Sequence, residues 1–296
     1  MPDYEVGEPE ALVIDAAPSL ARMYALSPYV WIEGGQWRLA LRAVPRTDRA
    51  EDKVSRVHLG TSDDGLRFAM DDEPFLAPGP DPADDDRDGC EDPTVVESDG
   101  YAVFYSGYNQ QTAKGQLLWA AGGDIRGLTK RGRVLPEPQA YDNAKEASVL
   151  QAADGTWRLY FEYARDGHSV LGAAEAPALE GPWTPCPPPF GLREGHWDDY
   201  HLSPGPIIGA GGDAPVLIYN GANRDTHWRI GWAQLDADCR RVVARSDGPL
   251  ITPPPVEDDA TDIAFAASAV EQGRTVFLYY AVSDRDLFRV PLSARG

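Results

Sequence analysis

The chain has 296 residues, with 27 basic and 47 acidic side chains that give a formal charge of −20. Hydrophobic residues make up 43% of it, enough to bury a core, so the composition excludes a disordered or fibrous chain. The strong negative charge argues against binding to nucleic acid. No run of about 18 apolar residues is present, so neither a membrane-spanning helix nor membrane association is expected.

The three cysteines, Cys90, Cys186 and Cys239, are far apart and odd in number. This pattern argues against a disulfide scaffold and indicates a reducing compartment. The first 15 residues also lack the basic and apolar regions of a secretory signal. We therefore expect a cytoplasmic protein, whose oligomeric state the sequence does not determine.

Five short apolar runs share one alternating pattern and start at residues 37, 101, 157, 216 and 276. They read WRLALRAV, YAVFYSGY, WRLYFEYA, VLIYNGAN and VFLYYAVS. A short strand ending in a turn precedes each run, and a second alternating strand follows it. The first four repeats then close with an edge strand that ends in proline. Four short strands per repeat are typical of propeller blades.

The repeats therefore predict an all-β fold, a single five-bladed β-propeller domain spanning residues 1–296 with four-stranded blades. The fifth repeat ends without its edge strand, whereas residues 10–18 (EALVIDAAP) form a spare one. We expect residues near 11–16 to pair with the strand around 286–291, so that the N-terminal strand closes the ring. A β-sandwich with accidental periodicity is the alternative.

The first strand of each propeller blade lines the central channel, so its leading residue faces the funnel mouth. Aligning the repeats on their turns places Ser27, Asp92, Glu146, Ser203 and Ala266 at this position. Two of these are acids on adjacent blades. Paired carboxylates suit glycoside cleavage, because one protonates the leaving oxygen while another group orients or activates the attacking group. The alternative role for such acids is to accept turn amides.

Several stretches resemble glycoside hydrolase family 130 in their order along the chain. They are LALRAV with Arg42, SRVHLGTSDDGLRF (55–68), GCEDPTVV (89–96), DAPVLIYNGA, and TVFLYYAVSD with Asp284. That family consists of five-bladed propellers that act on mannosides as phosphorylases or hydrolases, and it is related to the family 43 glycosidases. The resemblance implies a small oligosaccharide or glycoside as substrate. It makes Asp92 the proton donor, acting through a sugar hydroxyl.

Similarity to the wider group of propeller glycosidases implies that Asp92 and Glu146 match the second-blade and third-blade carboxylates, a transition-state stabiliser and a general acid. The first-blade aspartate of those enzymes is absent, because Ser27 stands there. We expect further residues around the sugar: Arg42, Glu91, Lys145, Glu162, His201, Asn220, Asp284 and Arg285.

Three departures from the family 130 pattern bear on the reaction. Thr94 replaces the arginine usual after EDP in the phosphorylases, Glu162 stands where a basic residue is expected, and Asn220 replaces a histidine. A phosphate dianion needs concentrated positive charge, and Glu162 would repel it. We therefore expect an inverting glycoside hydrolase, with carboxyl groups about 6.5–9.5 Å apart. A mannoside phosphorylase, a carbohydrate-binding or scaffold propeller, and an enzyme tailoring a secondary metabolite are the alternatives.

Two motifs resemble metal sites. Residues 84–89 read D-x-D-x-D-G, but the closing glutamate of a calcium loop is missing because residue 95 is valine. The segment HWDDYHLSPGP (196–206) has zinc-ligand residues but is better explained as a sugar-facing loop. We expect no metal and no cofactor, a solvated acidic loop at 84–89, and a buried Cys90 thiol rather than a nucleophile.

The aromatic residues divide into two groups by their place in the repeats. The loop aromatics are candidates for stacking on sugar faces, whereas the strand aromatics should pack between blades. The first group is Tyr108, Trp197, Tyr200 and Trp228, and the second is Tyr160, Phe161 and Tyr279.

Overall fold

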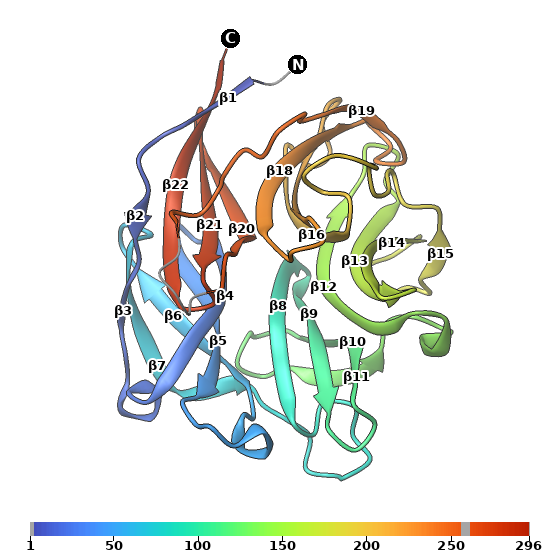
Figure 1. Cartoon of the computed structure of the whole chain (residues 1–296). Helices are drawn as coiled ribbons and strands as arrows, with labels where there is room; N and C mark the ends of the chain where they lie inside the picture. Colours follow the sequence, from blue (N-terminus) through green and yellow to red (C-terminus); the bar gives the residue numbers. More distant parts are fainter. Residues whose placement is uncertain (1–2, 256–260, 296) are drawn as a thin grey trace.

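A computed structural model describes residues 3–255 and 261–295, in which 22 strands form five sheets arranged as a ring (Figure 1). The helical segments of this described part are three single 3-10 turns at Pro18–Leu20, Ala50–Asp52 and Pro138–Ala140. None of them has the length or apolar character needed to cross a membrane. The five-bladed β-propeller predicted from the repeats is confirmed.

Each blade is an antiparallel sheet in which consecutive strands pair. Blade 1 contains β4 (Met23–Glu33), β5 (Gln36–Pro45), β6 (Arg56–Ser62) and β7 (Arg67–Leu76). Blade 2 contains β8 (Gly89–Ser98), β9 (Gly100–Asn109), β10 (Lys114–Gly122) and β11 (Thr129–Arg133). Blade 3 contains β12 (Asp142–Gln151), β13 (Trp157–Arg165), β14 (His168–Ala176) and β15 (Thr184–Cys186).

Blade 4 contains β16 (His201–Ile208), β17 (Val216–Ala222), β18 (Trp228–Leu235) and β19 (Val242–Arg245). Blade 5 contains β20 (Ala264–Gln272), β21 (Thr275–Val282) and β22 (Asp286–Arg295), completed by β1 (Asp3–Val6) and β2 (Glu10–Ala11). The proline-ended edge strand predicted for blade 2 was GRVLPEP (132–138), but β11 overlaps only its first two residues. The one predicted for blade 4 was GPLITPPP (248–255), and β19 lies before it. In blade 4 that segment adds only an isolated bridge between Ile230 and Ile251.

The N-terminal segment closes the ring, as the sequence predicts. β1 and β2 both run antiparallel to β22, with Glu10 opposite Arg289 and Ala11 opposite Phe288. The Leu12 N–H also donates to the Leu287 carbonyl at 2.8 Å, but the expected pairing of residues 11–16 is wrong beyond Leu12, because β3 (Val13–Asp15) pairs parallel to β7 instead. The N-terminal segment therefore joins blade 5 to blade 1, and Figure 1 shows it running along the outer edges of both.

Five buried hydrophobic clusters hold the ring together, and each spans one junction between neighbouring blades. The strand aromatics Tyr160, Phe161 and Tyr279 are at most 1% exposed and belong to three of these clusters. Their predicted role in packing between blades is confirmed. Burial of such large rings supplies most of the apolar contact between sheets that share no backbone ladder.

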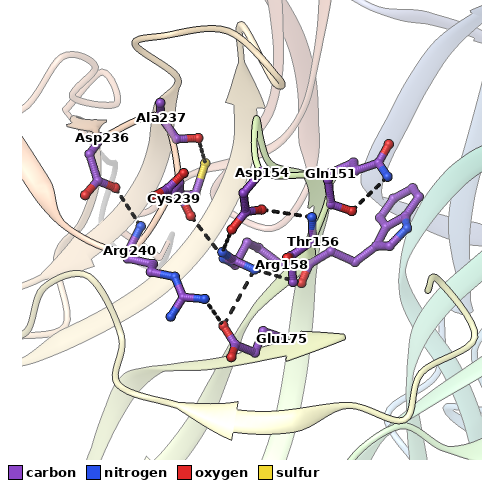
Figure 2. Close-up of polar contacts among 12 residues, drawn as sticks. Gln151, Asp154, Thr156, Arg158, Glu175, Asp236, Ala237, Cys239 and Arg240 are labelled. Atoms are coloured by element: carbon purple, nitrogen blue, oxygen red, sulfur yellow. Dashed lines mark hydrogen bonds and ion pairs between the residues drawn. The ribbon is translucent and has the colours of Figure 1, made fainter. Parts of the chain in front are cut away.

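Blades 3 and 4 are also joined by a buried arginine on the face opposite the ends that carry Lys145 and Glu146. Arg158 of β13 donates to the Asp238 carbonyl at 3.0 Å and to Asp154 at 2.8 Å, and lies 3.6 Å from Glu175 (Figure 2). Its side chain is 2% exposed. A guanidinium this deeply buried requires such complete pairing, because desolvation of the charge is costly.

A recurring β-bulge interrupts the inner strand of every blade and aims one residue at the channel. In blades 1 to 3 the bulged residues are Ser27, Asp92 and Glu146, with φ of 47°, 46° and 53°. The left-handed conformation is strained for residues other than glycine, and such strain is typical of functional sites.

The bulge in blade 4 contains Gly205, and the single bulged residue of blade 5 is Ala267. Our alignment of Ser203 and Ala266 with the leading position is therefore wrong by two residues and by one. Glycine is required in blade 4, because a Cβ at Gly205 would lie 2.6 Å from the carbonyl oxygen of Ile218.

Candidate active site

The bulges surround a cavity of about 380 Å³ at the mouth of the central channel. Its lining divides by blade. Blades 1 to 3 contribute nearly all of the polar groups, whereas blades 4 and 5 contribute mainly apolar side chains. The polar lining is Ser27, Arg42, Glu91, Asp92, Lys145, Glu146, Glu162 and Asp284, and the apolar lining is Leu26, Trp228, Ile263, Phe265, Ala267 and Ala281.

Asp92 is held by two side chains of blade 1 and is only 5% exposed. The Ser27 hydroxyl donates to Asp92 Oδ1 at 2.7 Å, and Arg42 Nη1 donates to the same oxygen at 3.1 Å. Burial would raise the pKa of Asp92, but the Arg42 charge and the Ser27 hydrogen bond outweigh it and lower the pKa. The lowered pKa favours the ionised form of Asp92.

The pKa of Glu146 is shifted in the opposite direction, although Glu146 occupies the equivalent bulge of blade 3. Burial and the neighbouring charge of Asp92 raise its pKa well above the ordinary range, and the nearby Lys145 only partly opposes them. Because two acids in one low-dielectric pocket cannot both ionise cheaply, the proton remains on Glu146. The funnel thus contains one carboxylate and one carboxylic acid, the division of roles that acid–base chemistry requires.

Two cations flank this pair. Arg42 Nη2 lies 2.6 Å from Glu91, which also accepts a 2.7 Å hydrogen bond from Ser55. Lys145 Nζ lies 3.4 Å from Glu162, its cross-strand partner on β13. The charge of Glu162 is the main cause of the raised pKa of Lys145.

Asp284 completes the polar lining from blade 5. It follows β21 in a left-handed conformation, with φ of 49°. Burial raises its pKa, and the Arg42 charge opposes the rise. Of the ten residues predicted for the site, the seven that line the funnel are Arg42, Glu91, Asp92, Lys145, Glu146, Glu162 and Asp284.

Arg285 and Asn220 are not among the described residues that line the funnel, which corrects our expectation for both. Arg285 is exposed and pairs with Asp286 at 2.9 Å, because the left-handed residues 283 and 284 turn the chain outward before it. Asn220 is fully buried and links two blades. Its amide donates to the carbonyls of Pro204 and Ala266 and accepts from the Ala266 N–H.

His201 also lies outside the described lining, but it packs behind it. Its ring stacks on Trp228 at 5.4 Å between centroids and 13° between planes. Burial lowers the pKa of His201, which favours the neutral form of its ring.

Thr94 lies beneath the funnel. Its hydroxyl donates to the Ala147 carbonyl at 2.6 Å, and Ser148 makes the same kind of bond to the Gly205 carbonyl. Ser268 donates to the Pro28 carbonyl at 2.8 Å. These hydroxyls follow the bulges and fix them relative to the next blade, so Thr94 positions the floor of the site.

No group of three or more His, Cys, Asp or Glu side chains in the described part of the chain is arranged to hold a metal ion. In the acidic loop, Asp86 is buried rather than solvated and accepts hydrogen bonds from Tyr105 and Lys130. Cys90 is fully buried, and burial raises the pKa of its thiol well above the ordinary value. The prediction that the Cys90 thiol is buried is confirmed, and a raised pKa disfavours the thiolate that a nucleophile requires.

Sequence reasoning identified only Trp228 in the apolar half of the funnel, as a candidate for stacking on sugar. Ile263 directly precedes β20 and Phe265 lies at its start, and no sequence motif marks either residue. Only the arrangement of the blades brings them opposite the acids. Ser27 appeared in the repeat alignment as a missing acid, yet it serves the site as a hydrogen-bond donor to Asp92. Ser27 aligns with Asp92 in the repeat, and this alignment could have indicated that Ser27 faces the funnel.

The fold and funnel define a five-bladed propeller with a carboxylate-lined central site, as in the propeller glycosidases. No protein-family model matches the chain. A β-1,2-mannobiose phosphorylase from Thermoanaerobacter sp. (strain X514) is 25% identical over 270 residues, which cover 85% of this chain and 84% of that protein. A second, from Listeria innocua, is 24% identical over 251 residues, and the match covers 79% of this chain but only 65% of that protein.

Solved structures show the same fold. A Listeria innocua β-1,2-mannobiose phosphorylase in complex with β-1,2-mannobiose has a TM-score of 0.78 at 19% identity, covering 94% and 93% of the two chains. Another structure comes from work on family 130 hydrolases that target β-1,2 linkages in Candida mannan. It has a TM-score of 0.80 at 21% identity and covers 100% and 98%. The resemblance to the family 130 mannoside phosphorylases is confirmed.

Proposed function

We propose that the chain is an enzyme that cleaves a β-mannosidic bond of a small oligosaccharide in this funnel. The observation that carries the proposal is the placement of Asp92 and Glu146 at equivalent bulges of adjacent blades in one funnel, where the pKa of Asp92 is lowered and that of Glu146 is raised. The mannobiose phosphorylases among its relatives support β-1,2-mannosides as the substrate class.

The two carboxyl groups hold one proton between them, and that proton is available for the leaving oxygen. The raised pKa of Glu146 favours this residue as the one that carries the proton. For Asp92 to act as the donor, as the family resemblance implies, the proton has to pass to Asp92 once the sugar occupies the site. Arg42 and Ser27 hold Asp92 in place for this step, and the remaining carboxylate stabilises the positive charge that develops on the sugar.

Phosphorolysis is the reaction that the relatives support better than the hydrolysis predicted from sequence. Phosphate oxygen would attack the anomeric carbon as the glycosidic bond breaks, and the proton would pass to the leaving oxygen. The products are mannose 1-phosphate and the shortened saccharide. Arg42 and Lys145 are the cations of the described funnel lining that could attract phosphate.

Hydrolysis with inversion is the second candidate, favoured by the charge of the funnel. Five carboxylic acids and two basic residues line it, and both cations are already paired with carboxylates. A phosphate dianion entering this pocket would meet a net negative environment, whereas water would not. Water would supply the attacking oxygen, a carboxylate would take its proton, and the products would be two free sugars.

Incubation of the protein with β-1,2-mannobiose, with and without inorganic phosphate, separates these reactions. Chromatography that resolves mannose from mannose 1-phosphate identifies the product. Phosphorolysis gives mannose 1-phosphate only when phosphate is present, whereas hydrolysis gives mannose at the same rate in both samples. Absence of turnover on a panel of mannosides and aryl glycosides under both conditions would favour the carbohydrate-binding or scaffold alternative.

A further inference from the structure

Four aromatic rings form a continuous path that leads away from the funnel. Trp228 lines the funnel and stacks on His201, whose ring lies 4.6 Å from that of Tyr200. The ring of Tyr200 lies 4.4 Å from that of His168, and His168 lines a separate cavity of about 400 Å³. We call Trp228, His201, Tyr200 and His168 the ring path.

The ring path lies on the face of the propeller that carries the funnel mouth. His168, His201 and Trp228 begin β14, β16 and β18, at the same blade ends as Lys145 and Glu146. All four rings are partly exposed, unlike the core rings Tyr160 and Tyr219, which are at most 1% exposed. Partly exposed rings in a row next to a polar pocket can offer apolar faces to the C–H groups of sugar units.

The two histidines of the ring path present opposite hydrogen-bonding groups at Nε2. The backbone group that contacts Nδ1 determines whether Nε2 donates or accepts. The Ser169 N–H donates to His201 Nδ1 at 2.8 Å, so the proton of this neutral ring is on Nε2. His168 Nδ1 lies 3.1 Å from the Tyr200 carbonyl oxygen, so it donates, and its Nε2 accepts while the ring is neutral. One donor and one acceptor along a row of rings match sugar hydroxyl groups, which both accept and donate.

The cavity at the end of the ring path has the mixed lining of a saccharide site. Tyr163, Phe190 and Leu192 supply apolar surface, whereas Arg165, Asp166 and His168 supply polar groups at its edge. It lies beside β14 and the segment before β16, at the junction of blades 3 and 4. A chain that extends from the funnel over Trp228 would reach it across adjacent rings.

We propose that the ring path and this cavity bind the leaving-group side of an oligomannoside, beyond the unit that is directly joined to the cleaved bond. The inference rests on the proposed function for the class of sugar, and it deepens that function to substrates longer than a disaccharide. The funnel would fix the reacting unit, and the ring path would add affinity for each further unit.

Steady-state kinetics on β-1,2-linked mannobiose, mannotriose and mannotetraose test the proposal with the whole protein. The wild type should prefer the longer substrates, and Tyr200→Ala should lower kcat/KM for them about three- to tenfold while mannobiose is unchanged. Tyr200→Phe, which keeps the ring, should restore the preference. Tyr24→Ala is the control, because Tyr24 is an exposed tyrosine that also lies under an arginine but belongs to blade 1.

Calorimetric titration of mannotriose and mannobiose into the same variants separates this inference from the proposed reaction. If no mannoside is cleaved, the proposed function fails, yet tighter binding of mannotriose by the wild type than by Tyr200→Ala still supports the ring path. Equal affinity of the wild type for the two sugars, no binding of either sugar, or equal losses for both in Tyr200→Ala overturns it.

Discussion

Arg42 Nη1 donates to Asp92 Oδ1 at 3.1 Å while Nη2 lies 2.6 Å from Glu91, so one guanidinium bridges two consecutive acids of the EDP motif. This bridge crosses from blade 1 to blade 2 and faces the funnel. It is the largest influence that opposes the effect of burial on the pKa of Asp92. Arg42 therefore both orients Asp92 and sets its charge.

Arg42→Lys should retain a positive charge but lose the planar fork that contacts both carboxylates. We expect a loss of about 10- to 100-fold in kcat/KM and a rise in the pKa of the acidic limb of the pH–rate profile. Steady-state rates across pH measure both effects. Arg46→Lys, at an exposed arginine just after β5, is the control and should leave the profile unchanged. An unshifted acidic limb in Arg42→Lys would contradict the role given to this bridge.

Asp92→Asn removes a titratable group and leaves the size of the side chain unchanged. General acid–base catalysis contributes about 10²- to 10⁴-fold, so we expect at least a loss of that order with the fold intact. Activity and the thermal unfolding temperature should be measured together. Asp99→Asn, in the exposed turn at the other end of β8, should be neutral. Near-normal activity of Asp92→Asn would remove Asp92 from the catalytic pair.

The sequence was sufficient to predict the propeller and the central pair of acids, because both follow from a repeat. Asp92 and Glu146 stand at the same bulge in two blades, so alignment of the repeats found them without knowledge of the structure. The same alignment failed in blades 4 and 5. In blade 4 the bulge lies at Gly205, and in blade 5 it consists of the single residue Ala267. Strand pairing rather than residue type determines the position of the bulge in both blades.

The errors at Asn220 and Arg285 have a different cause. Both residues are polar and belong to segments that we expected to face the channel. The direction of a side chain, however, depends on the local backbone. At Asn220 the amide is used fully between blades, and at Arg285 two left-handed residues redirect the chain. The apolar wall around Phe265 escaped prediction because no local pattern marks an apolar residue that faces a ligand instead of a core.

Arg158→Met should destabilise the fold strongly, because it leaves Asp154 and Glu175 without their buried partner (Figure 2). The side chains of Asp154 and Glu175 are 32% and 30% exposed, so we expect a loss of about 2–3 kcal/mol rather than the larger cost of leaving a fully buried charge unpaired. Chemical denaturation measures the free energy of unfolding. Arg240→Met is the matched control, since Arg240 also contacts Glu175 but its side chain is 52% exposed, and it should cost at most about 1 kcal/mol. Equal losses in both variants would show that the burial of Arg158 adds nothing to the free energy of unfolding beyond an exposed ion pair.

Glu162→Gln should strengthen phosphate binding in the funnel. The change removes the negative charge that is paired with Lys145, so the cation becomes available and the net negative charge of the pocket falls. We expect the Kd for inorganic phosphate to decrease by about tenfold. Calorimetric titration of phosphate measures this whichever reaction the enzyme performs. Glu175→Gln, outside the funnel, should leave the Kd unchanged, and weaker phosphate binding by Glu162→Gln would contradict the repulsion argument.

Glu146→Gln should abolish activity yet stabilise the fold at neutral pH. Burial and then the charge of Asp92 raise the pKa of Glu146 in the folded protein, so the folded state binds a proton that the unfolded state has already lost. The wild type therefore loses stability as pH rises from the ordinary glutamate pKa of about 4.3 towards the raised folded value. Glutamine carries no charge at any pH and avoids this loss.

The gain in unfolding temperature of Glu146→Gln over the wild type should therefore be small near pH 4 and increase steadily towards about pH 8. Thermal unfolding of both proteins across this range measures it. Glu137→Gln, at an exposed glutamate in the segment before β12, should show no trend with pH. A gain that is constant across pH, or a loss that deepens as pH rises, would mean that Glu146 is ionised in the folded protein. The proton of the pair would then have to lie elsewhere, and the division between Asp92 and Glu146 would be wrong.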